Sequence, residues 1–373
     1  MSEPILVTRP YLPPLTELLP LLEQIWETRI LTNNGPFHQQ LEARLADLFG
    51  APHVSLMANG MLALTAAIDA SGISGEIITT PYSFVATAHA VQIGRAKPVF
   101  VDVRRSDLNI DPAGIEAAIG PRTGGIVAVH CYGNPCDVDA IESIAGRHGL
   151  PVIYDAAHAF GVTYRGRSLL SWGDFATLSF HATKAFNTFE GGAVVAGDAA
   201  GKAAIDRIRN FGIEDEVSIP SVGVNAKMSE FNAALGLLQL DHFEQVRAAR
   251  AACDRLYRQL LAEVAGIECL SVPAETEPNY SYFPILVTAD YPLARDGLYD
   301  RLKQHGIHAR RYFYPLLSTL PSYRQVPSAA PENLPVATRA AQEVLCLPIY
   351  PDLPHTQVER IARIIGEGAS GGA

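Results

Sequence analysis

An α/β fold is predicted for this chain of 373 residues, with a mostly parallel mixed sheet, helices on both faces and a smaller C-terminal α/β domain. Two observations predict it. Strand-like and helix-like segments alternate from about Leu48 to Leu240, and a shorter α/β pattern follows. The length allows two domains, which we place at 1–240 and 241–373.

The strand-like segments are short apolar runs bounded by turn residues. In chain order they are Ile77–Thr79, Pro98–Val103, Gly125–His130, Pro151–Tyr154, Ala176–Phe180 and Ala193–Ala196. Between them lie helical patterns such as Val138–His148. Apolar residues recur at helical spacing from Met228 to Leu238, and a long helix is predicted over His242–Val264. The smaller domain then shows a strand at Ser281–Val287 and a helix at Arg295–His305.

Composition and charge exclude several classes of protein. Hydrophobic residues make up 48% and charged residues 18%, which is typical of a globular chain. The formal net charge is −10 and no basic run occurs, so neither nucleic acid nor an anionic membrane is an expected partner. The N-terminus lacks a signal-peptide pattern and no long apolar span occurs, which predicts a cytoplasmic protein.

The five cysteines are scattered and odd in number, as in a reducing compartment. His130 and Cys131 with Cys136 would allow a metal site. No second pair of ligands lies nearby, and Cys131 continues a buried-strand pattern, so no metal site is predicted.

The segment Asp174–Gly192 carries the most chemical information. Lys184 lies just past a strand-like run, and no other formal charge occurs between Asp174 and Glu190. Phenylalanines 180, 186 and 189 flank it. Desolvation lowers the pKa of a lysine, and the neutral amine can attack an aldehyde to form a Schiff base. The alternative is a solvated lysine on a loop.

A carboxylate earlier in the chain favours a lysine that forms a Schiff base. Asp155 ends a short apolar run, and in an open α/β sheet the ligand crevice lies beyond the carboxyl ends of the strands. Pyridoxal 5'-phosphate (PLP) requires a lysine on its aldehyde and a carboxylate on its ring nitrogen. A helix cap or a metal ligand are the alternatives for Asp155 alone. Lys184, placed 29 residues later, favours the cofactor.

A phosphate site is predicted where Asn59 and Gly60 follow an apolar run and begin an alanine-rich helix. Asn59 is a suitable N-cap, and Gly60 lets a ligand approach the backbone. The free N–H groups at such a helix start bind phosphate. Many helices begin this way without a ligand, so the signal is weak alone. Ser179, at the end of the strand before Lys184, offers a hydroxyl to the same phosphate.

These segments together resemble the DegT/DnrJ/EryC1/StrS family of PLP-dependent nucleotide-sugar aminotransferases. The resemblance covers nearly the whole chain in family order, through Leu31–Pro36, Thr80–Thr87, the Asp155 segment, Ser179–Lys184 with Glu190–Gly192, Gly223–Glu230, Tyr312–Leu316 and Leu347–Pro351. It implies the fold type I of PLP-dependent transferases, which is aspartate aminotransferase-like, and a homodimer with shared active sites.

The resemblance also implies roles for single residues. Phe84 should lie over the cofactor ring, Asp155 should pair with its nitrogen, and His158 should lie near its hydroxyl. The phosphate should be held by Ser179 and by the backbone of Gly60 and Met61. From the second subunit, Asn225 should reach the same phosphate, with Lys227 as the alternative. Lys184 is the implied catalytic base. His181 orients the sugar, assists proton transfer or merely packs beside the site. The implied substrate contacts are Asn34, Glu190 and Tyr314.

The chain departs from the family pattern at two positions: Met61 stands where Thr is usual, and Phe313 where His is common. Because Lys184 is present, the dehydratase branch is disfavoured. The form Ser179-Phe180-His181 with Glu190-Gly191-Gly192 resembles the branch that acts on 4-keto sugars. This implies transfer of an amino group from an amino acid, glutamate, to C4 of a nucleotide-linked 4-keto-6-deoxy sugar such as dTDP-4-keto-6-deoxyglucose. The alternatives are a 3-keto nucleotide-sugar aminotransferase and a non-catalytic PLP-binding regulator.

Overall fold

The main sheet has seven strands in the order β2-β10-β9-β6-β5-β3-β4. The computed structural model describes residues 4–369. The strands are β2 (Val54–Met57), β3 (Glu76–Thr79), β4 (Lys97–Phe100), β5 (Thr123–Val129), β6 (Val152–Asp155), β9 (Phe175–Ser179) and β10 (Gly192–Ala196). In this sheet β10 runs opposite to the other six strands, so its pairings with β2 and β9 are antiparallel and the remaining pairings are parallel. The prediction of a mostly parallel mixed sheet is confirmed.

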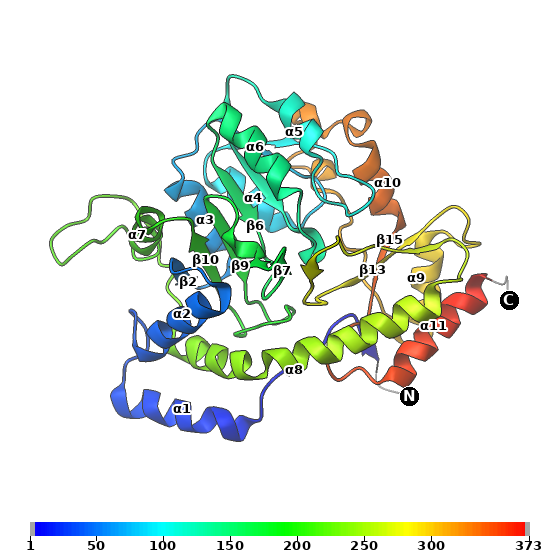
Figure 1. Cartoon of the computed structure of the whole chain (residues 1–373), viewed down its shortest axis with the longest axis horizontal. Helices are drawn as coiled ribbons and strands as arrows, with labels where there is room; N and C mark the ends of the chain where they lie inside the picture. The colour runs from blue at the N-terminus through cyan, green and yellow to red at the C-terminus, as the bar shows by residue number, and fades with distance from the viewer. Residues whose placement is uncertain (1–3, 370–373) are drawn as a thin grey trace.

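Helices cover both faces of this sheet (Figure 1). They are α2 (Pro36–Phe49), α3 (Gly60–Ala70), α4 (Val85–Ile93), α5 (Pro112–Ala118), α6 (Val138–His148) and α7 (Ala199–Ile208). Neighbouring strand residues pack to opposite sides: Tyr154 joins one buried apolar cluster and Ile153 another. The first cluster includes residues of α2, α5 and α6, and the second includes residues of α3, α4 and α7. The fold therefore has three layers, as alternating strands and helices require.

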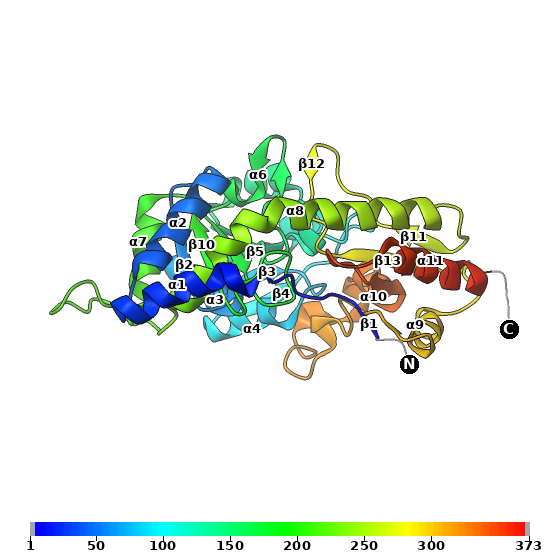
Figure 2. The same cartoon turned by 90° about the horizontal axis from the view of Figure 1, so that it is seen from below.

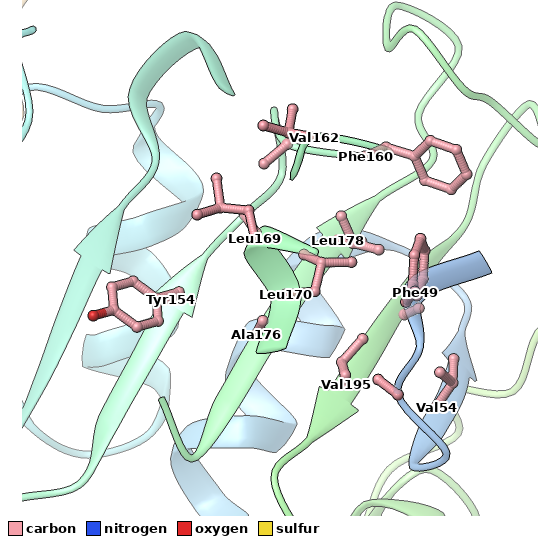
Figure 3. Packing of buried hydrophobic residues seen from close by; sticks show 14 of the residues in the cluster. Phe49, Val54, Tyr154, Phe160, Val162, Leu169, Leu170, Ala176, Leu178 and Val195 are labelled. Atoms are coloured by element: carbon pink, nitrogen blue, oxygen red, sulfur yellow. The ribbon is translucent and has the colours of Figure 1, made fainter. Parts of the chain in front are cut away.

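The core on the α2 and α6 side contains aromatic rings at its edge. In Figure 3, Phe49 and Phe160 lie beside the strand residues Leu178 and Val195. The rings of Phe160 and Phe186 stack with centroids 4.0 Å apart. Phe186 lies two residues after Lys184, so this packing anchors the loop that carries the lysine to the core.

A long helix, α8 (Glu230–Leu261), runs along the molecule below the sheet, next to α1 (Leu15–Thr28) (Figures 1 and 2). Ser229 caps it by accepting the N–H of Asn232. The apolar pattern from Met228 and the helix predicted over His242–Val264 are one continuous element. It crosses the boundary placed at 240/241: Phe243 belongs to the core of the main sheet and Cys253 to a separate C-terminal core. The division into domains stays a prediction.

The C-terminal part has a three-stranded antiparallel sheet in the order β11-β13-β15. Its elements are β11 (Ile267–Cys269), β13 (Phe283–Val287), β15 (Val344–Leu347), α9 (Arg295–Gln304), α10 (Pro335–Glu343) and α11 (His355–Ala369). Early in the chain, β1 (Ile5–Leu6) pairs with β14 (Ile307–His308), so these residues lie with the C-terminal part. None of the helices in residues 4–369 combines the length and the apolar character needed to cross a membrane.

The remaining elements are short. A small sheet contains β7 (Thr163–Tyr164), β8 (Arg167–Ser168) and β12 (Thr276–Glu277). The 3₁₀ helices are η1 (Cys131–Gly133), η2 (Leu169–Ser171), η3 (Leu317–Thr319), η4 (Pro327–Ala329) and η5 (Pro331–Asn333). Strands β6 and β9 are paired in parallel, with Asp155 opposite Thr177, so their carboxyl ends lie side by side. The site is built at this edge.

Candidate active site

A cavity of about 510 Å³ lies at the carboxyl ends of β6 and β9, against the N-terminal ends of α3 and α4. Most of the predicted site residues line it, namely Gly60, Met61, Phe84, Asp155, His158, Ser179, His181, Lys184 and Glu190. Among the described residues, its lining does not include Asn34, Asn225 or Tyr314. One chain therefore brings together most of the residues predicted for the cofactor, with His181 and Glu190, but not Asn225, predicted for the phosphate, or the substrate contacts Asn34 and Tyr314.

Lys184 lies on the loop after β9, where its backbone N–H donates to the carbonyl of His181. The side chain is half-buried, and its Nζ donates a hydrogen bond to the hydroxyl of Tyr282 over 3.3 Å. Burial lowers the pKa of Lys184 from 10.5 to about 8, although the negative charge of Asp155 opposes this shift. The amine is therefore partly neutral near neutral pH, as a nucleophile or base requires.

Asp155 is the last residue of β6 and is only 7% exposed. The hydroxyl of Thr87 donates to its Oδ2 over 2.8 Å, and the N–H of Ala157 donates to its Oδ1 over 3.2 Å. Burial raises the pKa of this carboxyl, whereas these two hydrogen bonds and the charge of Lys184 lower it. A cation in the cavity would offset the remaining cost of burying the carboxylate.

Thr87 is a site residue that the sequence did not single out, although it lies in the Thr80–Thr87 segment that carries the family resemblance. It occupies the first turn of α4, three residues after Phe84. Residues three apart share a face of a helix, which is the local signal that identifies it. Its bond to Asp155 fixes α4, and with it Phe84, against the end of β6.

His158 is held as a neutral imidazole. Its Nδ1 accepts the backbone N–H of Tyr132 over 3.2 Å, so the proton of the neutral ring is on Nε2. Burial, assisted by the charge of Lys184, holds the pKa of His158 well below its usual value. The ring of Phe313 stacks on it, with centroids 5.6 Å apart and planes 7° apart. The Nε2–H group is thus a fixed donor on the wall of the cavity.

Phe313, which replaces the usual histidine of the family pattern, points inward. It is 5% exposed and stacks between His158 and Tyr132, whose ring centroid is 5.7 Å from its own. An apolar ring here supports the cavity wall and offers no hydrogen bond to a sugar. The neighbouring Tyr314 is 52% exposed and lies under the guanidinium of Arg295, 4.7 Å from its ring centroid.

The start of α3 is suited to bind an anion. Asn59 accepts the N–H of Leu62 over 2.9 Å, which leaves the first N–H groups, those of Gly60 and Met61, for a ligand. A Cβ on Gly60 would lie 2.6 Å from the Cβ of Ser179. Only glycine therefore lets the helix start approach the end of β9 this closely.

At the mouth of the cavity, His181 and Glu190 form an exposed pair. The Nε2 of His181 lies 3.8 Å from Oε1 of Glu190, and its Nδ1 accepts the N–H of Thr183 over 3.2 Å. The Nε2 atom therefore carries the proton of the neutral ring. A donor and an acceptor side by side are suited to bind neighbouring hydroxyl groups.

The remaining predicted residues lie on the surface. Asn225 accepts a 2.8 Å hydrogen bond from Lys227, whose Nζ also donates to Asn210 over 3.0 Å. Asn34 lies in an exposed turn before α2, where its carbonyl accepts from Gln39 over 2.7 Å. Their predicted roles stay predictions.

The donor set of the cavity fits PLP. It offers an amine of lowered pKa, a buried carboxylate suited to a cationic ring nitrogen, a neutral imidazole N–H, and a helix start with Ser179 for a phosphate. Within residues 4–369, no group of three or more His, Cys, Asp or Glu side chains is arranged to hold a metal ion.

The chain is similar to known proteins over nearly its whole length. The family model described as DegT/DnrJ/EryC1/StrS aminotransferase family matches residues 16–366. A dTDP-4-amino-4,6-dideoxy-D-glucose transaminase of Shigella dysenteriae is 50% identical, covering 98% of this chain and all of the relative. The enzyme of the same name from Escherichia coli is 48% identical, covering 96% of this chain and 97% of the relative.

A solved structure is also closely similar. The structure of DesI in the presence of its TDP-sugar product has a TM-score of 0.95 at 36% identity, covering all of this chain and 95% of that one. The predicted fold type is thereby confirmed. This chain belongs to the DegT/DnrJ/EryC1/StrS aminotransferase family.

Proposed function

We propose that this aminotransferase moves an amino group from L-glutamate to C4 of dTDP-4-keto-6-deoxyglucose, giving the 4-amino-4,6-dideoxy sugar. The observation that carries the proposal is the half-buried amine of Lys184, with a pKa of about 8, in a cavity that also holds Asp155. The two transaminases that share about half of their residues with this chain support this choice of sugar.

The chain supplies the groups that hold the cofactor. When bound, PLP supplies an aldehyde for amines and a ring that withdraws electrons. The carboxylate of Asp155 would pair with the ring nitrogen, and Nε2–H of His158 would donate to the ring oxygen. The start of α3 and the hydroxyl of Ser179 would hold the phosphate, and the exposed face of Phe84 would cover the ring.

Lys184 moves the proton in both halves of the reaction. A pKa near 8 gives the amine both protonation states at neutral pH, so Nζ can act as a base and then as an acid. As a base it would take the proton from the α-carbon of glutamate and, as an acid, deliver it to the aldehyde carbon of the bound cofactor, which then holds the amino group. In the second half it would take a proton back from that carbon and deliver it to C4 of the sugar, to which the amino group is transferred.

The choice between 4-keto and 3-keto sugars is assigned to His181 and Glu190 at the mouth of the cavity. This pair would bind the hydroxyl groups beside the ketone. A site built to bind particular hydroxyls rejects a sugar that leaves its polar groups unpaired. We therefore expect 3-keto isomers to react slower by at least about a hundredfold.

The test is a panel of nucleotide-linked 4-keto and 3-keto sugars with glutamate, read by product mass and NMR. In parallel, His181→Tyr should reduce amination of the 4-keto sugar more than the half-reaction with glutamate, which does not use this pair. A preference for 3-keto sugars would move the enzyme to the other branch. Binding of PLP without turnover of any sugar would favour a regulator.

We also infer that the active unit is a homodimer with shared sites. The segment that follows α7 extends away from the body of the molecule (Figure 1) and ends at Asn225. Its apolar side chains are exposed, with Val217 at 91% and Val222 at 86%. Apolar surface of this kind is suited to a protein interface. A second copy packed there would bring Asn225 to the phosphate end of its neighbour's cavity.

A further inference from the structure

Tyr282 contacts the reactive amine from the C-terminal part of the chain. It directly precedes β13, the central strand of the C-terminal sheet, whereas Lys184 follows β9 of the main sheet. Its hydroxyl lies 3.3 Å from Nζ of Lys184, and its ring centroid lies 5.8 Å from the same atom. The ring also packs edge-on against His158, with centroids 4.9 Å apart. His158 therefore supports the ring while the hydroxyl meets the amine of Lys184.

Three titratable groups face the amine from the packed elements. Asp155 faces it from the end of β6, His158 from the loop after β6, and Tyr282 from the segment before β13. Asp155 is bonded to Thr87 and Ala157, and His158 is neutral. Among the residues described, the structure shows a side-chain hydrogen bond from Nζ of Lys184 to the hydroxyl of Tyr282.

A phenol suits this position because it can form a hydrogen bond with both the charged and the neutral amine of the lysine. Burial raises the pKa of Tyr282, so the group stays protonated. Its oxygen accepts a hydrogen bond from an ammonium group, and its O–H can donate to the lone pair of a neutral amine. Lys184 needs such a partner whenever its amine is free.

We propose that Tyr282 is a catalytic residue, whose hydroxyl holds the free amine of Lys184 where it exchanges protons with the substrate. This inference rests on the proposed function, in which Lys184 moves the proton in each half-reaction. The hydrogen bond to the charged amine is stronger than the bond to the neutral one. Removing the hydroxyl therefore destabilises the ammonium form more, and the pKa of Lys184 should fall.

The test compares Tyr282→Phe with Tyr312→Phe. Both tyrosines line the cavity, but the structure shows a bond to Lys184 only for the first. The pKa of Lys184 is measured on cofactor-free protein, from the pH dependence of amine labelling followed by peptide mapping. Tyr282→Phe should lower it by about one pH unit, and Tyr312→Phe should leave it unchanged.

The kinetic readout is the single-turnover half-reaction with glutamate. Tyr282→Phe should slow it by about 10- to 100-fold while the dissociation constant for PLP changes less than about twofold. An unchanged pKa and an unchanged rate in folded Tyr282→Phe protein would overturn the proposal. So would an equal shift of the pKa in the Tyr312→Phe control.

A second substitution keeps the test decisive if the phenylalanine variant does not fold. Fluorotyrosine at position 282 keeps the shape of the ring and makes the phenol a weaker acceptor, so the pKa of Lys184 should again fall. The labelling experiment needs neither cofactor nor sugar. Its result is therefore independent of the sugar panel, and failure of the proposed function remains distinguishable from failure of the role of Tyr282.

Discussion

The two ends of the cavity differ in how completely one chain builds them. At the inner end, Asp155 and His158 are buried and bonded, and Lys184 is hydrogen-bonded to Tyr282. At the rim, His181 and Glu190 are exposed, and Asn225, predicted for the phosphate of a neighbouring subunit, lies on the surface outside this chain's cavity. The groups whose pKa values are shifted by burial are enclosed by their own chain, whereas groups that recognise a substrate can also come from a second subunit. The inner end therefore suits the cofactor, and the rim is open to a partner.

The largest loss of turnover is expected from substitution of Lys184, at the inner end of the cavity. Lys184→Ala removes the nucleophile and the base, so turnover should fall by about 10⁴-fold or more. Borohydride reduction followed by peptide mapping should label Lys184 in the native protein and no lysine in the variant. Label on Lys227 or on another lysine of the native protein would contradict the assignment. PLP should still bind the variant without a covalent bond.

Asp155→Asn tests whether the carboxylate at the inner end pairs with the ring nitrogen of the cofactor. The amide keeps the size of the side chain but not its charge, so the ring nitrogen loses its partner. The rate should fall by about 10²- to 10³-fold, measured as kcat with saturating glutamate and sugar. Asp155→Glu should also be damaging, because its longer side chain displaces the carboxylate. Near-normal activity of the Asn variant would indicate that Asp155 has only a structural role, as the partner of Thr87.

Mixed dimers test whether a second copy completes the phosphate site. Lys184→Ala and Asn225→Asp chains should each be impaired, the first without its base and the second with a negative charge beside a phosphate. A mixed dimer would contain one site with both native groups and so up to half of the native activity per dimer; an equimolar mixture that pairs at random should regain about a quarter. Activity is measured after denaturation and refolding of the mixture. Failure to recover, with subunit exchange proven by mass, would mean that Asn225 serves its own chain or no phosphate.

The smallest expected change is in the rate at which Lys184 reacts with PLP as the pH is varied. Only the neutral amine of Lys184 reacts with an aldehyde, and its pKa is lowered to about 8. The rate at which cofactor-free protein captures PLP should therefore rise about tenfold per pH unit below 8 and level off above it. Stopped-flow absorbance measures this rate. A rate that still rises tenfold per unit up to pH 10 would mean that Lys184 keeps an ordinary pKa.

Much of the inner end was predictable because its signals are local. Strands of the main sheet have short apolar runs, and the carboxyl ends of parallel strands meet at one edge. The direction of the strands therefore predicts that Asp155 and the loop of Lys184 lie together. Asn59 and Gly60 mark the start of α3 by their own capping chemistry.

Other features of the site depend on contacts between distant segments. Tyr282 reaches Lys184 from 98 residues further along the chain, and the N–H of Tyr132 meets His158 from 26 residues before it. Neither contact leaves a periodic pattern in the sequence. The inward position of Phe313 depends in the same way on the two rings that enclose it.

The sequence by itself determined the layered α/β architecture, the presence of Lys184 and Asp155 in one cavity, and the capped helix start beside it. These depend on periodicity, capping and strand direction, which act over a few residues. Only the tertiary structure decided the tautomer of His158, the partner of Lys184 and the continuity of α8 across two cores. Those features depend on which surfaces pack together, and packing of distant segments is determined by shape and burial in the folded molecule.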